Sequence, residues 1–169
     1  MNFKKNIIAF LVIGLLGTVG HFVYDWSGEN SILGLIFPVS ESVWEHLKLL
    51  FFPTIIYSSF EYLFSHEKPR NYLAATAIGL FCGLATVIVI YYLVNGIVGY
   101  DISFINITSY YIAVIVLLCK KRTVILKEKF YSKNANIFFA VLLGVTALLF
   151  FIWSYNPPSL GIFTPPITV

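Results

Sequence analysis

The feature that most constrains this chain is a series of five long apolar runs. Each approaches or exceeds the roughly 20 residues that an α-helix needs to cross a bilayer. A soluble domain could not present so much apolar surface to water, because 59% of the 169 residues are hydrophobic and only 11% are charged. The pattern predicts an all-α, polytopic membrane protein, a bundle of about five transmembrane helices. The expected spans are about 6–26, 41–64, 72–98, 102–119 and 136–155.

The chain is predicted to form a single transmembrane helical domain over residues 1–169, because no soluble-type linker separates the runs. The first run is interpreted as a retained helix, since no small-residue cleavage site follows it. A net charge of +3 does not indicate nucleic acid as a partner, because the basic residues lie near the predicted helix ends. Membrane lipids are the expected partners.

The basic residues also predict the orientation. They precede the first run and occupy the connections after the second and fourth runs, including segment 120–133, which all lie on one side. The opposite connections contain Glu29 and Asp101 but no Lys or Arg. Cytoplasmic loops are enriched in Lys and Arg. The N-terminus is therefore expected in the cytoplasm and the C-terminus outside, in a multi-pass protein of the plasma membrane.

Two segments on the predicted outer side are unusual. Residues 27–39 are too apolar for a solvated loop and too short to span, so we expect them to lie in the outer interface or dip into it. The tail 156–169 has four prolines and no charge, and is expected to lie extended on the outer surface. Either segment is placed to cover a site.

Ionisable residues are concentrated where the first run ends and the second begins. Such groups are costly at membrane depth, and they generally pair, line a cavity or function. Two helices joined by a short connection are expected to be neighbours, so their polar faces should meet just below the outer interface. The residues of this cluster are His21, Asp25, Glu41, Glu45, His46 and Lys48.

Imidazoles together with carboxylates are typical ligands of a divalent metal of intermediate hardness, such as zinc, manganese or iron. We therefore predict an outward-facing buried polar site that binds a cation, most simply a metal. No H-E-x-x-H or E-x-x-H spacing is present to specify the ion. The predicted ligands are His21, Asp25, Glu41, Glu45 and His46, with Ser42 and Lys48 in support.

Three functions stay open at this point, and the residues do not decide whether the protein is an enzyme. Without a metal, the cluster would bind another cation or relay protons. A metal-dependent hydrolase would act on a lipid or isoprenoid ester, with Glu41, Glu45 and His46 as candidate catalytic residues. A structural or partner-binding protein would use the cluster as an internal salt-bridge network. Ser42 and Glu45 have the capping-box spacing, and Lys48 lies three residues beyond Glu45.

Gly79 and Gly83 form a small-xxx-small pair in the third run. Such a pair permits close helix approach within or between subunits. A homo-oligomer through this face is therefore an expectation.

The block GHFVYDWSG, followed by FPVSESVWEHLKLLFFP, resembles a family of small bacterial integral membrane proteins of unknown function. The likeness is clearest from Gly20 to Pro53, and the end NPPSLGIF is similar as well. The resemblance implies a bacterial cell membrane and the topology described above. It implies no activity.

Overall fold

The computed structural model describes residues 3–66, 68–100 and 102–166. Among them it contains no β-strand, which confirms the all-helical prediction for this part of the chain. The helices are α1 (Phe3–Trp26), η1 (Leu33–Leu35), α2 (Val43–Phe64), α3 (Tyr72–Val98), α4 (Ser103–Leu126), α5 (Lys133–Tyr155) and η2 (Gly161–Phe163), where η marks a 3-10 helix.

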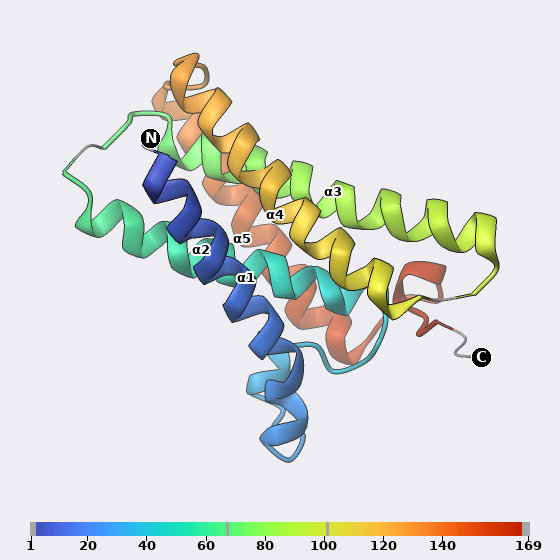
Figure 1. The fold of residues 1–169 in the computed structure, drawn as a ribbon. Coiled ribbons are helices and arrows are strands. Elements are labelled where there is room, and N and C mark those ends of the chain that lie inside the picture. Colours follow the sequence, from blue (N-terminus) through green and yellow to red (C-terminus); the bar gives the residue numbers. More distant parts are fainter. Residues whose placement is uncertain (1–2, 67, 101, 167–169) are drawn as a thin grey trace.

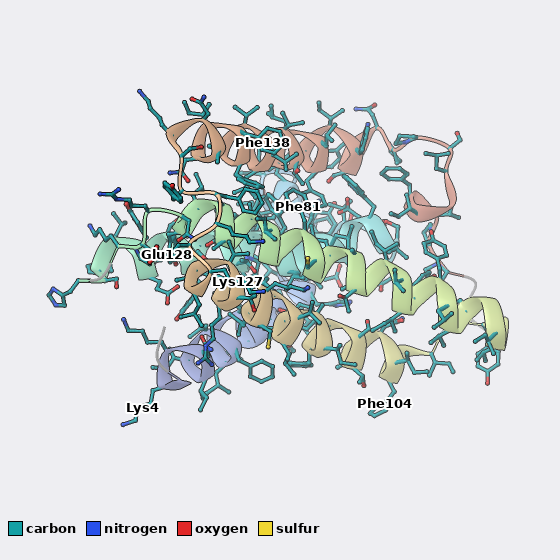
Figure 2. The ribbon with its side chains drawn as sticks, turned by 90° about the horizontal axis from the view of Figure 1, so that it is seen from above. Lys4, Phe81, Phe104, Lys127, Glu128 and Phe138 are labelled. Carbon is teal, nitrogen blue, oxygen red and sulfur yellow. The ribbon has the colours of Figure 1, made fainter. Side chains whose placement is uncertain are left out.

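Four of these helices, α1, α3, α4 and α5, are long and apolar enough to cross a membrane. Helix α2 is not among them, and it carries Glu45, Lys48 and Glu61. Five spans therefore stay a prediction. The exterior of the bundle is rich in large apolar side chains. Phe104 and Phe138 are 76% and 60% exposed, and Phe104 points away from the bundle in Figure 2, which suits contact with lipid.

The connections gather toward two ends of the bundle (Figure 1). The start of α1 and the connections α2–α3 and α4–α5 lie toward one end, whereas the connections α1–α2 and α3–α4 and the C-terminal tail lie toward the other. Lys4 and Phe104 mark these two ends in Figure 2. The first end carries the basic connections and is called the basic end below.

The core lies where α1, α2, α3 and α4 meet, and Leu50, Leu80 and Leu117 are fully buried there. Helices α3 and α4 approach closely because glycines face α4. A Cβ added at Gly79 would lie 2.6 Å from the Leu117 carbonyl oxygen, and one at Gly83 would also meet α4. The close approach that this pair permits is thus made inside the chain. A homo-oligomer through the same face stays a prediction.

Helix α4 continues to Leu126, beyond the expected end near residue 119. Lys121 consequently lies inside the helix, is 1% exposed, and has its Nζ 2.9 Å from Glu61 Oε2. The same Nζ donates to Ser58 Oγ and to the Tyr72 hydroxyl. This buried ion pair joins α2, α3 and α4 near the basic end. The sequence predicts residue 121 in a connection, because an ion pair between residues so distant in sequence leaves no local pattern.

Candidate metal centre

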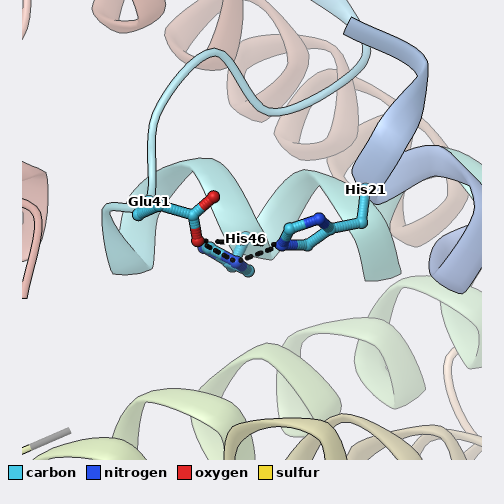
Figure 3. A group of neighbouring side chains, drawn as sticks. All are labelled: His21, Glu41 and His46. Carbon is cyan, nitrogen blue, oxygen red and sulfur yellow. Dashed lines mark hydrogen bonds and ion pairs between the residues drawn. The ribbon is translucent and has the colours of Figure 1, made fainter. Parts of the chain in front are cut away.

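Three ionisable side chains converge where α1 meets the start of α2 (Figure 3). His21 comes from α1, Glu41 from the end of the α1–α2 connection, and His46 from the first turns of α2. The two Nε2 atoms are 3.1 Å apart. Glu41 Oε2 lies 3.7 Å from His21 Nε2 and 3.4 Å from His46 Nε2. The described residues contain no other group of three His, Cys, Asp or Glu close enough to hold one metal ion.

The first turn of α2 decides which nitrogen of His46 faces the cluster. Ser42 caps the helix, since its Oγ accepts a hydrogen bond from the Glu45 backbone N–H at 3.3 Å. The Ser42 carbonyl accepts from His46 Nδ1 at 2.9 Å. A carbonyl can only accept, so Nδ1 carries the proton and Nε2 of the neutral ring is bare. The bare nitrogen points toward His21 and Glu41.

The two imidazoles are half-buried and the Glu41 side chain is 67% exposed. Two bare nitrogens at 3.1 Å would repel each other, so the pair needs a proton or a cation between its Nε2 atoms. The neighbouring imidazole of His21, and then that of His46, lower the pKa of the Glu41 carboxyl. Glu41 is therefore a carboxylate at neutral pH.

The structure does not bring all five predicted ligands together, because Glu45 turns away to Lys48. Glu45 Oε2 lies 2.7 Å from Lys48 Nζ, and the two side chains are 3% and 0% exposed. Lys48 also donates to the Gly34 carbonyl, while Glu45 accepts from the Val39 N–H and the Ser154 hydroxyl. The pair fastens the α1–α2 connection and α5 onto α2. It is an internal salt-bridge network, as the structural alternative anticipated for these two residues.

Asp25 also lies outside the metal-ligand group. It shares a helix face with His21 but sits one turn closer to the end of α1, where its side chain is exposed. The contact with α2 is made at the turn of His21, whose Nε2 meets that of His46. Helical spacing identified the shared face, but only the packing shows which turn meets α2.

A cavity of about 360 Å³ adjoins the three ligands. Its walls are mainly apolar and come from α1, α2, α3 and α4, with Pro166 of the tail at the edge. Tyr110 lines it and donates its hydroxyl to the Ile13 carbonyl at 2.8 Å. The volume falls within the roughly 300–1,000 Å³ typical of ligand pockets. The sequence carries no signal for apolar wall residues such as Val87 and Ile107, because lipid-facing and cavity-facing residues are equally apolar.

The fold indicates to which class of protein this chain belongs. An all-helical chain with four helices able to cross a membrane is compatible with a multi-pass membrane protein. The chain belongs to a family of unknown function, DUF6512, whose model matches residues 1–169. No curated protein and no solved structure matches it. The resemblance to a family of unknown function is thus confirmed, and its quoted block and the bacterial origin stay predictions.

Proposed function

We propose that His21, Glu41 and His46 bind one divalent transition-metal ion in a multi-pass membrane protein. The observation that supports this most is the triangle of donor atoms, whose edges measure 3.1, 3.4 and 3.7 Å. Ligand atoms about 2.0–2.1 Å from a tetrahedral zinc ion lie about 3.3–3.4 Å from each other. One ion above the triangle would therefore contact all three atoms after small side-chain adjustments.

The ligand types support zinc, iron or manganese. Two imidazoles and one carboxylate form the ligand set of many zinc and non-haem iron sites, and no thiolate is present in the group for a softer ion. Three protein ligands leave a coordination position open. The molecule that occupies this open position would bind in the adjoining cavity, because all three protein ligands line the cavity.

The distribution of basic residues supports an outward-facing site, and the family resemblance implies that the membrane is a bacterial cell membrane. The basic connections share one end of the bundle, while the α1–α2 connection that carries Glu41 lies toward the other. With the basic end in the cytoplasm, the N-terminus is inside and the C-terminus and the metal centre are near the outer surface.

Metal titration of the full chain in detergent tests the proposal. After treatment with a chelator, the protein is titrated calorimetrically with zinc, manganese and iron(II). We expect one ion per chain and a loss of affinity greater than about 100-fold in His46→Ala, because a ligand is removed. His66→Ala is the matched control, since His66 is exposed in the α2–α3 connection.

Either of two outcomes would overturn the proposed site. One is that the wild-type chain binds none of the three ions. The other is that His46→Ala and His66→Ala bind them equally well, which would place the ion elsewhere.

A metal-dependent hydrolase is the second candidate, and the cavity is the observation that favours it. A bound ion would lower the pKa of a water molecule to about 7 and polarise an ester carbonyl. Phe22, Leu49 and Ile107 in the walls would hold the hydrocarbon part of a lipid or isoprenoid ester. Product release from fluorescent esters of both classes, with and without metal, tests this activity. No hydrolysis by the metal-loaded protein would refute the enzyme and leave the binding site standing.

A further inference from the structure

A second cavity, of about 610 Å³, lies between α2, α3 and α5 and extends to the start of α3 at the basic end. It shares no lining residue with the cavity beside the metal centre. Its walls are mainly apolar, and it reaches the backbone of α5 at Gly144, where an added Cβ would meet no atom within 4 Å. Helix α5 lies on the side of the bundle opposite α1 in Figure 2. The cavity has the size and the apolar walls that a hydrocarbon chain requires.

Two polar atoms in this wall have no hydrogen-bond partner among the residues that the structure describes. Thr76 is 2% exposed and its Oγ1 makes no hydrogen bond, and Asn136 Oδ1 is likewise buried without a partner. Thr54, outside the cavity wall, is the other described helical threonine in this state. Buried polar atoms are normally paired, so the wall indicates a ligand with polar groups. The remaining helical threonines donate to a carbonyl four residues earlier: Thr18, Thr86, Thr108, Thr123 and Thr146.

The mouth of the cavity is positively charged. Arg70 lines it just before α3 begins, and its guanidinium pairs with no carboxylate of the described residues. Lys68 Nζ lies 5.2 Å from the ring centre of Tyr62, which is also part of the wall. The positive end of the α3 dipole adds to these charges. A phosphate group is the complement of such a mouth, because guanidinium binds phosphate oxygens in a bidentate manner.

We propose that this cavity binds an anionic phospholipid from the leaflet at the basic end of the bundle. The phosphate lies at Arg70 and Lys68, and the Thr76 hydroxyl donates to an ester carbonyl of the glycerol backbone. One acyl chain extends between α2 and α5 past Gly144. Free phosphate would occupy only the charged mouth, whereas a phospholipid matches both the cations and the apolar walls.

Lipid retention by the purified full chain tests this proposal. The protein is exchanged into mixed micelles of phosphatidylglycerol or phosphatidylcholine with identical acyl chains, and bound lipid is counted by native mass spectrometry. We expect one phosphatidylglycerol per chain and weaker retention of phosphatidylcholine. Arg70→Gln should reduce the preference for phosphatidylglycerol about fivefold, the effect of one basic residue on an anionic lipid.

Two glycine variants separate the cavity from the rest of the surface. Gly144→Leu fills the apolar part and should abolish retention of the lipid. Gly96→Leu is its matched control, because Gly96 is another helical glycine with open space at its Cβ but lies outside the cavity wall. It should retain lipid as the wild type does. If Gly144→Leu does not fold, Thr76→Val serves instead, with reduced retention expected.

Several results would overturn the proposal. Equal retention of the two lipids by the wild type would exclude a phosphate-selective headgroup site. Equal retention by Gly144→Leu and Gly96→Leu would place the lipid elsewhere. Stabilisation by inorganic phosphate to the same extent as by phosphatidylglycerol would show that only the charged mouth binds. A chain pair that Gly144→Leu dissociates would show that a second copy occupies the cavity.

Discussion

Glu45 and His46 are neighbours in the chain, yet their side chains lie in two different kinds of polar cluster. Glu45 and Lys48 are almost fully buried, and their charged atoms are matched by each other, by the α1–α2 connection and by α5. His46 faces His21 and Glu41 across short distances, in a half-exposed cluster beside a cavity. The first cluster has its hydrogen bonds satisfied inside the protein. In the second cluster, the three metal-ligand atoms lie close together around a common point.

The number of hydrogen bonds left open, more than charge, distinguishes a structural cluster from a candidate binding site. A buried ion pair whose remaining bonds are satisfied has nothing left to offer a ligand. The pair of Lys121 and Glu61 follows the same pattern, because Ser58 and Tyr72 complete it. Of the ionisable groups in α2, only His46 belongs to the metal-ligand group among the described residues.

The largest expected effect is on the buried pair of Glu45 and Lys48. Lys48→Met removes the ammonium group and leaves the Glu45 carboxylate buried without a counter-charge. We expect the free energy of unfolding to fall by about 3–5 kcal/mol, measured by denaturant unfolding in mixed micelles. The double variant Glu45→Gln with Lys48→Met should recover much of this loss and still bind zinc. A single variant as stable as the wild type would show that the pair is not structural.

An intermediate effect is expected from pH on metal binding by His21, Glu41 and His46. Metal ligands must be deprotonated, and histidine is the side chain that changes its charge between about pH 5 and 8. The lowered pKa of Glu41 keeps that carboxylate ionised over the same range. Zinc affinity should therefore fall by up to about 100-fold as the pH drops, because protons compete with the ion for both imidazoles. Affinity that is constant in calorimetric titrations over this range would contradict ligation by histidine.

The smallest effect is expected at the junction of the two clusters. Ser42→Ala removes the hydroxyl that caps α2 and should lower the free energy of unfolding by about 1 kcal/mol. The carbonyl that orients His46 belongs to the backbone and is kept. Thermal unfolding should therefore change while zinc titration does not. A large loss of zinc affinity with unchanged stability would reverse the roles assigned to the hydroxyl and the carbonyl.

Much of the helical pattern was predictable from the sequence. The range expected for the third run, 72–98, coincides with α3. The fourth run was predicted too short, because basic residues after Cys119 indicated a connection, whereas α4 continues and Lys121 is buried against Glu61. The ion pair with Glu61 allows the charge of Lys121 to be buried, whereas the local sequence pattern predicts that this charge is in water.

The region of the candidate site was predictable as well, but its membership was not. Helical spacing placed Glu45 and Asp25 with the other ligands, yet the structure turns Glu45 to Lys48 and leaves Asp25 exposed. Both cavities were beyond sequence reasoning, because apolar positions on these helices do not distinguish a cavity wall from a lipid-facing surface.

Two properties follow from the order of amino acids alone: the chain forms long apolar helices, and a cluster of six ionisable residues lies at the junction of the first two. Apolar runs and charge positions are local properties, so they can be read along the chain. Helix packing is what brings His21, Glu41 and His46 together and pairs Glu45 with Lys48. Neighbouring side chains point in different directions from one helix, and what each one meets depends on how the other helices pack around it.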